Sequence, residues 1–144
     1  MKKIMVINGV NLNMLGIREK NIYGEATYDG LCEYIRSKCN DTSVELEFFQ
    51  SNHEGAIIDC MQKCYFDGFD GIVINPGAHT HYSYALYDAI KSIAPIPVVE
   101  VHISDIRSRE DFRKVSVTAP ACIAQISGKG FDGYVEAVKM LAEK

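Results

Sequence analysis

Hydrophobic residues fall into five short runs separated by longer amphipathic segments. The short runs have the length and composition of buried β-strands; they span residues 3–7, 44–49, 71–75, 97–103 and 122–127. Most of the longer segments repeat apolar residues at helical spacing; these predicted helices span residues 27–39, 54–68, 81–94 and 133–144. The interval between the last two strands is mostly loop-like. The pattern therefore alternates strands with helices.

The ends of these segments carry helix signals. Thr27 is a candidate N-cap, the second predicted helix stops at Gly68, and the third stops before Pro95. Strands that alternate with helices predict a parallel sheet with helices on both faces. We therefore expect the α/β class, as one domain over residues 1–144. The predicted architecture is a flavodoxin-like three-layer sandwich with a five-stranded parallel sheet in the order 2-1-3-4-5.

Composition narrows the class of protein. The chain has 144 residues, 47% of them hydrophobic, and a net charge of −4, with its 15 Lys and Arg scattered rather than clustered. A nucleic-acid or anionic-membrane partner is therefore not expected. Only four consecutive apolar residues precede Asn8, too few for a signal-peptide core, so we expect a cytoplasmic protein whose five cysteines stay reduced. Cys60 and Cys64 have one-turn helical spacing; helix packing is favoured over a metal site for them.

Polar residues collect where three of the predicted strands end. They are Asn8 and Asn11 after the first strand, Asn75, His79 and His81 after the third, and Glu100, His102 and Ser104 in and after the fourth. In a sheet of this order the ligand site lies beyond the carboxyl ends of the strands, near the switch in strand order. Each residue alone is weak evidence, but their convergence from separate strands predicts a site.

Motifs for common cofactors are missing from the sequence, which contains no GxGxxG, GxxxxGK[ST] or GxSxG. Zinc held by His79, His81 and His102 is a less favoured alternative, because neighbouring loop histidines need an accommodating backbone. The remaining chemistry is proton transfer. Tyr23 is a candidate base if cations lower its pKa, and Arg18 lies five residues before it.

Further cations come from the segment after the fourth strand, which supplies Arg107, Arg109 and Arg113. They would lower the tyrosine pKa and hold an anionic substrate. A simpler interpretation has Arg18 solvated and Tyr23 packed on the sheet. The length of their loop favours a lid, because loops beyond about 12 residues are uncommon in compact domains.

The chain resembles a known family in five stretches. They are "NGVNLNMLGIREKNIYG", "FFQSNHEGAIID", "GIVINPGAHTHYSYALYDAI", "VVEVHISDIRSREDFRKVS" and "ISGKGFDGYVEAV", in that order. Together they are similar to the type II 3-dehydroquinate dehydratases, or type II dehydroquinases, over nearly the whole chain. The resemblance implies a cofactor-free and metal-free lyase of the shikimate pathway that acts on 3-dehydroquinate.

The resemblance also implies a role for each matching residue. Tyr23 would be the general base and His102 the general acid, with Arg18, Arg109, Asn11 and Glu100 supporting the catalytic steps. The implied substrate-binding residues are Asn75, His81, Asp88, Ile103, Ser104 and Arg113. Asp88 would come from a neighbouring subunit of a homododecamer built as four trimers.

Six positions depart from the usual family pattern: Val10, Lys20, His79, Tyr82, Tyr87 and Asp105. None removes an implied catalytic group, but they bear on lid rigidity and subunit packing. The alternative to an enzyme is a non-catalytic flavodoxin-like domain that binds an anion or signals at the same edge. An acidic cluster after the first strand would favour signalling, and the chain has Asn8 and Asn11 there instead.

Overall fold

A five-stranded parallel sheet forms the centre of the molecule, in the order β2-β1-β3-β4-β5. The computed structural model describes residues 1–17 and 26–144. The strands are β1 (Lys2–Asn8), β2 (Val44–Gln50), β3 (Gly71–Asn75), β4 (Val98–His102) and β5 (Ala124–Ser127). The predicted strand order is therefore confirmed, with strand bounds that differ by at most two residues.

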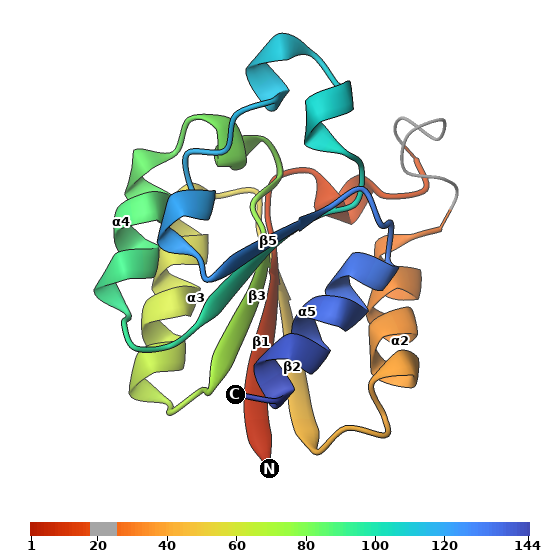
Figure 1. Ribbon diagram of the computed structural model, residues 1–144, viewed down its shortest axis with the longest axis vertical. Helices are drawn as coiled ribbons and strands as arrows, with labels where there is room; N and C mark the ends of the chain where they lie inside the picture. The colour runs from red at the N-terminus through yellow and green to blue at the C-terminus, as the bar shows by residue number, and fades with distance from the viewer. Residues whose placement is uncertain (18–25) are drawn as a thin grey trace.

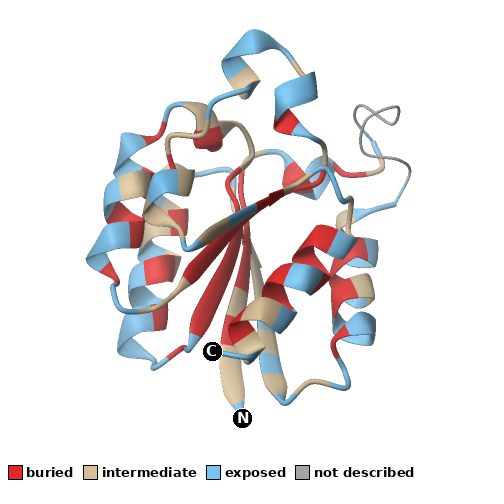
Figure 2. Ribbon diagram, viewed as in Figure 1, coloured by how far each residue is buried: buried red, intermediate tan, exposed pale blue. Residues whose placement is uncertain are grey.

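Two layers of helices cover the sheet (Figure 1). One face carries α3 (Glu54–Phe66) and α4 (Tyr84–Ser92), and the other carries α2 (Tyr28–Lys38) and α5 (Asp132–Ala142). The predicted flavodoxin-like three-layer arrangement is thus confirmed. Each layer encloses its own apolar core, and strands β3 and β4 between them are buried along their whole length (Figure 2).

The helix ends follow local capping chemistry. The Thr27 side chain accepts a hydrogen bond from the backbone N–H of Gly30, as an N-cap should. Gly68, just beyond α3, has φ of 75°, a conformation that glycine adopts without strain. The third helix begins later than predicted: Ser83 caps α4 by accepting from the N–H of Leu86, so His81 lies in the 3₁₀ turn before it.

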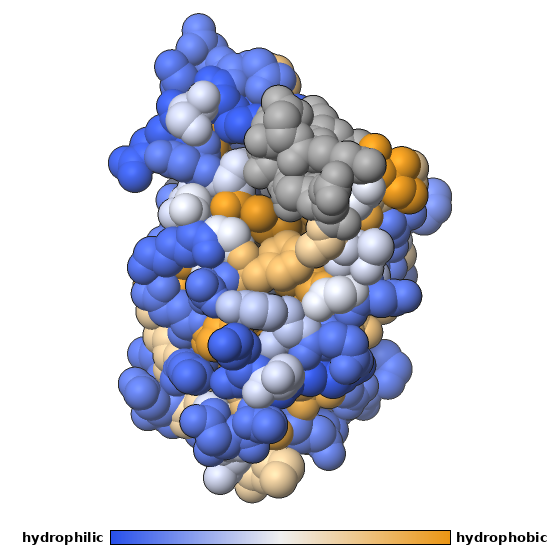
Figure 3. Space-filling view, turned by 90° about the vertical axis from the view of Figure 1, so that its right-hand side faces the viewer, coloured by the Kyte–Doolittle hydropathy of each residue, from blue (hydrophilic) through white to orange (hydrophobic). Residues whose placement is uncertain are grey.

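The segment between β4 and β5 crosses the carboxyl edge of the sheet (Figure 1). It contains three short 3₁₀ turns, Ile106–Ser108, Asp111–Arg113 and Ala119–Ala121, in place of a long helix. The face seen in Figure 3 is hydrophilic over most of its lower half, while hydrophobic residues gather higher up, towards the same edge. None of the helices in the described residues is long and apolar enough to cross a membrane.

Candidate active site

The pocket lies at the carboxyl edge of the sheet, where three neighbouring strands end. Asn8 ends β1, Asn75 ends β3 and His102 ends β4, and Asn8 is in register with Asn75. The chain after each strand turns back over the edge. The lining residues are Val10, Asn11, Leu12, Leu15, Asn75, Gly77, Ala78, His81, His102, Ile103, Ser104, Ile106, Arg109 and Arg113. The site therefore lies where the strand order predicts it.

Two glycines let the loops after β1 and β3 approach each other. A Cβ at Gly9 would lie 2.3 Å from the carbonyl oxygen of Pro76, and one at Gly77 would lie 2.6 Å from the carbonyl oxygen of Val10. Gly77 also has φ of 64°. Because only glycine lacks the Cβ, backbone meets backbone here, and the β1 side of the pocket is fixed against the β3 side.

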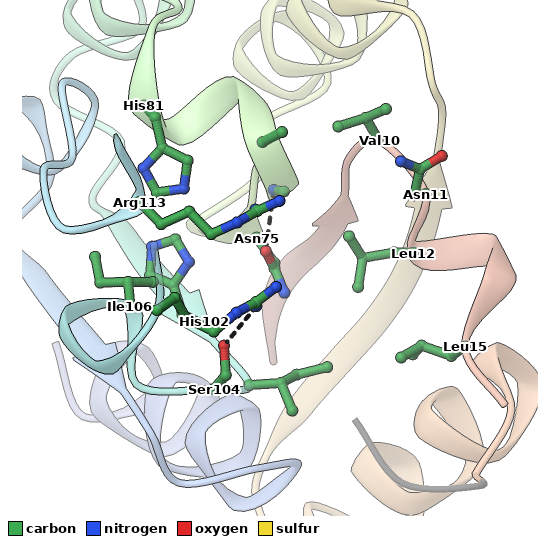
Figure 4. A pocket seen from close by; sticks show the side chains of 14 residues that line it. Val10, Asn11, Leu12, Leu15, Asn75, His81, His102, Ser104, Ile106 and Arg113 are labelled. Carbon is green, nitrogen blue, oxygen red and sulfur yellow. Dashed lines mark hydrogen bonds between the residues drawn. The ribbon is translucent and has the colours of Figure 1, made fainter. Parts of the chain in front are cut away.

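Glu100 and His102 project from the same face of β4, two residues apart. His102 Nε2 lies 2.8 Å from Glu100 Oε2, and both side chains are buried, Glu100 completely. Because a carboxylate only accepts, Nε2 carries hydrogen and donates. His102 lines the pocket (Figure 4), whereas Glu100 is not part of the lining, so the carboxylate fixes the imidazole ring at the pocket wall from within the protein.

Four donors surround the Glu100 carboxylate. Besides His102, Oε2 accepts from the Ser116 hydroxyl at 2.8 Å and the Gln125 amide at 2.9 Å, and Oε1 accepts from the Thr118 hydroxyl. Burial by itself raises the pKa of Glu100, but the hydrogen bonds from His102, Thr118 and Gln125 outweigh it. The pKa of Glu100 is therefore below its ordinary value, and the group is ionised at neutral pH.

His81 faces the pocket from the 3₁₀ turn after β3. Its Nδ1 lies 2.8 Å from the carbonyl oxygen of Val115 and must donate to it. Burial lowers the pKa of His81, and the positive charge of Arg113 lowers it further. The ring is therefore neutral at pH 7, and its Nε2 is an acceptor.

Two arginines enter from the segment after β4. Arg109 donates to the Ser104 hydroxyl at 3.2 Å, and its side chain is only 9% exposed. Arg113 forms an ion pair with Glu110, at 3.2 Å from Nε to Oε1, and Glu110 also lies 3.6 Å from Arg109. Glu110 thus pairs with both guanidinium groups, whose planar donors suit a carboxylate or hydroxyl ligand.

The loop after β1 contains a non-glycine residue, Asn11, with a left-handed backbone conformation. Asn11 has φ of 69°, and its backbone N–H donates to the side chain of Asn52 at 2.8 Å. Asn tolerates this left-handed conformation better than most residues. Gln50, at the end of β2, donates to the same Asn52 oxygen at 3.2 Å, so β2 and its loop position Asn11 at the pocket mouth.

Most of the predicted site residues converge. Eight line the pocket: Asn11, Asn75, His81, His102, Ile103, Ser104, Arg109 and Arg113. Glu100 supports one of them from behind. Asp88 is exposed on α4 and lies outside this pocket. Arg18 and Tyr23 lie outside the described residues, as does the family departure Lys20.

The other family departures are peripheral except for one. Val10 lines the pocket, whereas His79 is buried and is not part of the lining; its ring centroid is 5.7 Å from that of Tyr82. Tyr82 and Asp105 are exposed, and Tyr87 is half-buried.

The histidines and the pair Cys60 and Cys64 are the candidate metal ligands of the sequence. In residues 1–17 and 26–144, no group of three His, Cys, Asp or Glu side chains is placed to hold a metal ion. Cys64 is buried in the core under α3 and α4, and Cys60 packs against that core. The cysteine pair therefore lies in the packing position that helical spacing favours.

Sequence reasoning missed the side chains that hold the site from behind. Ser116, Thr118 and Gln125 bind Glu100, and Tyr134 binds Asn75. Nothing in the sequence marks the three Glu100 donors, because Ser, Thr and Gln are ordinary loop and edge residues. Tyr134 carried a weak signal: its hydroxyl needs a partner when the ring is buried.

The chain belongs to the family described as Dehydroquinase class II, which it matches over residues 2–142. The 3-dehydroquinate dehydratase of Clostridium beijerinckii is 60% identical over 142 residues, covering 99% of this chain and 97% of the relative. The 3-dehydroquinate dehydratase of Fusobacterium nucleatum is 59% identical over 143 residues, covering 98% and 97%. The resemblance seen in the sequence is therefore confirmed at the level of the family.

Solved structures of the family have the same fold. The type II dehydroquinase of Butyrivibrio crossotus superimposes with a TM-score of 0.95 at 58% identity, covering 97% of each chain. That of Propionibacterium acnes has a TM-score of 0.94 at 36% identity, covering 100% of this chain and 98% of the other.

Proposed function

We propose that this chain is a hydro-lyase that dehydrates 3-dehydroquinate to 3-dehydroshikimate, a step of the shikimate pathway that leads to aromatic amino acids. One observation carries the proposal: His102 is held at the pocket wall by the fully buried, ionised Glu100. A histidine in this setting suits proton transfer. Membership of the family supports the choice of substrate.

The reaction is an anti elimination through an enolate. Tyr23 removes the proton from the carbon beside the ketone, and Arg18 and Arg109 stabilise the phenolate and the developing charge. An enolate oxygen needs preorganised donors, each worth roughly 2.7–4 kcal/mol in a closed site. A water molecule held by Asn11, at the pocket mouth, supplies one such donor.

His102 then protonates the departing hydroxyl, so that water leaves. With Nε2–H engaged by Glu100, the other ring nitrogen, Nδ1, delivers a proton only when the ring is an imidazolium. The Glu100 carboxylate stabilises that cation and keeps the ring in one orientation. Two groups thus transfer protons on opposite sides of the substrate: Tyr23 removes one from the carbon, and His102 gives one to the leaving oxygen.

Substrate recognition divides between the carboxylate and the ring hydroxyls. Asn75, Ser104 and the backbone N–H of Ile103 bind the substrate carboxylate. Arg113 and His81 bind the ring hydroxyls, and a neutral His81 accepts a hydroxyl hydrogen at Nε2. Donors and acceptors are thereby matched to an anionic polyol.

The working protein is a cytoplasmic homododecamer, a tetramer of trimers, of one dehydroquinase domain per chain. It needs neither metal nor cofactor, since proton transfer and positioning account for the chemistry. The exposed Asp88 on α4 completes the site of a neighbouring subunit.

The direct test is to mix the purified chain with 3-dehydroquinate and to follow the ultraviolet absorbance of the conjugated enone product. We expect turnover that survives exhaustive chelation, and no substrate–lysine adduct after borohydride, because an enolate route needs no Schiff base. Lack of enone formation would overturn the proposed substrate. A metal requirement or a trapped adduct would overturn the proposed mechanism.

A further inference from the structure

A buried hydrogen-bond chain fixes the orientation of the Asn75 amide. The first hydrogen bond of this series comes from a backbone donor: the N–H of Gly77 donates to Asn75 Oδ1 at 3.1 Å. A backbone N–H cannot reverse its role, so the side-chain atom facing it must be the oxygen. The amide nitrogen of Asn75 therefore points the other way, into the molecule.

The Tyr134 hydroxyl meets that nitrogen. Asn75 Nδ2 donates to it at 2.8 Å, and the hydroxyl donates in turn to Asn8 Oδ1 at 2.6 Å. Since the hydroxyl has a single hydrogen, accepting from Asn75 commits that hydrogen to Asn8. The donor and acceptor roles along the series, from Asn75 through Tyr134 to Asn8, are therefore all set by the backbone N–H of Gly77.

The location of Tyr134 makes this contact a rigid one. Tyr134 lies in the first turn of α5, is completely buried, and is the largest fully buried side chain of the core. Its ring packs in the apolar core under α2 and α5, while its hydroxyl reaches the ends of two adjacent strands. Helix α5 therefore has a direct polar link to the pocket edge.

We propose that Tyr134 is a positioning residue that holds the Asn75 amide for the substrate carboxylate. The inference rests on the proposed function. One N–H of Asn75 Nδ2 is taken by Tyr134, and no described residue accepts a hydrogen bond from the second. Asn75 is one of the pocket-lining residues (Figure 4), so a carboxylate ligand there can accept from the second N–H.

The test is the Tyr134→Phe variant, which removes the hydroxyl and keeps the ring. Losing one of two restraints loosens the Asn75 amide, so we expect KM for 3-dehydroquinate to rise about 5- to 20-fold, the range of one weakened hydrogen bond to a charged group. We expect kcat to change less than threefold, because the hydrogen bonds of the hydroxyl described above go to Asn75 and Asn8 and not to His102.

A double-mutant cycle with Asn75→Ala separates positioning from general destabilisation. If Tyr134 acts through Asn75, adding Tyr134→Phe to Asn75→Ala leaves KM unchanged. If the two effects multiply, or if Tyr134→Phe alone leaves KM unchanged, the inference is overturned. Ile57→Val in the core under α3 is the matched control: it removes buried contacts on the opposite face and should leave KM unchanged.

A second variant covers a failure of Tyr134→Phe to fold. Asn8→Ala removes the acceptor of the hydroxyl, which then can turn its hydrogen away from Asn8 and hold Asn75 less firmly. We expect a smaller rise in KM that again disappears in the Asn75→Ala background; no rise would overturn the inference. Absence of turnover in the wild-type chain would overturn the proposed function and this inference together, whereas normal wild-type turnover confines any failure to Tyr134.

Discussion

The Glu100 carboxylate accepts hydrogen bonds from four side chains, one of which, His102, lines the pocket. Its four hydrogen-bond donors come from β4, β5 and the segment between these strands. A buried charge is costly unless such donors satisfy it, and a satisfied network is rigid. The position of His102 is therefore set by the whole carboxylate network rather than by one hydrogen bond.

We expect Glu100→Gln to lower kcat about 10- to 100-fold while leaving the fold intact, because the amide keeps the shape but cannot stabilise an imidazolium. It should also lower the free energy of unfolding by about 1–3 kcal/mol at pH 7. The folded-state pKa of Glu100 is lowered, so its contribution to stability is complete above the unfolded pKa of about 4.3 and is lost as pH falls below it.

Urea unfolding of wild type and variant from pH 7 to pH 3 measures this contribution. The difference between the two proteins should shrink as pH falls through the acid range. Glu45→Gln, at an exposed position of β2, is the control and should change neither kcat nor the unfolding profile. A difference that grows at low pH would contradict the assignment.

The proposed role of Tyr23 as general base is tested by removing its hydroxyl group. Tyr23→Phe should lower kcat by about 10²-fold or more, the usual contribution of a general base, with little change in stability. Arg18→Ala should lose most of its rate in kcat as well. Steady-state kinetics with circular dichroism as a folding control checks both. A Tyr23→Phe enzyme with wild-type kcat would exclude Tyr23 as the base.

The chemistry of single residues was partly predictable from the sequence. Glu100 and His102 stand two apart on a strand, so their shared face follows from strand geometry. Their partners Thr118 and Gln125 did not follow, because a hydrogen bond across 18 or 25 residues depends on how an irregular segment folds back. The spacing of residues within a strand shows which side chains share a face, but it does not show which distant residues an irregular segment brings back to them.

At the scale of elements, the site depends on the contact between the loops after β1 and β3. Gly9→Ala should lower the free energy of unfolding by about 2–3 kcal/mol, because its Cβ would overlap the backbone carbonyl of Pro76 at 2.3 Å and the backbone has to shift. KM should rise too, since the loop carrying Asn11 moves. Chemical denaturation and steady-state kinetics measure the two effects.

Gly55→Ala is the matched control for this substitution. Gly55 lies in the first turn of α3, and a Cβ there meets nothing within 4 Å. Since alanine favours helix over glycine by up to about 1 kcal/mol, stability should stay the same or rise. If both variants lose the same free energy of unfolding, the close contact between the two loops contributes nothing beyond the general effect of replacing glycine by alanine.

Element order was predicted well because strands and helices have distinct hydrophobic periods. The predicted start of α4 was three residues too early, because the apolar pattern from His81 onward suits a helix but Ser83 supplies the N-cap. The same sequence therefore begins as a 3₁₀ turn that carries His81 to the pocket. Capping competes locally with periodicity, and periodicity alone does not reveal the outcome.

At the scale of the molecule, the proposed assembly, in which the exposed Asp88 completes a neighbouring site, predicts that activity depends on oligomerisation. Tyr84 is one turn before Asp88 on α4 and is 71% exposed in the single chain. If Asp88 completes a neighbouring site, Tyr84 lies at the same interface. Tyr84→Glu should then dissociate the oligomer and lower activity per chain, increasingly so on dilution, by mass action.

Light scattering and enzyme assays at a series of protein concentrations check the assembly prediction. Phe66→Glu introduces the same charge at an aromatic residue that is 86% exposed at the end of a different helix, α3, and should leave size and activity unchanged. Folded Tyr84→Glu monomers with full activity would show that each chain completes its own site.

The order of Glu100 and its donors along the sequence affects how the chain folds while it is being synthesised. All four donors follow Glu100 in the sequence, and the last, Gln125, lies on the final strand. A nascent chain that has emerged only as far as β4 offers the Glu100 carboxylate just one of its four donors, His102, so ionisation opposes burial of that strand. Folding of the segment after β4 and docking of β5 supply the other three donors, so the buried Glu100–His102 pair is fully satisfied only once the final strand is in place.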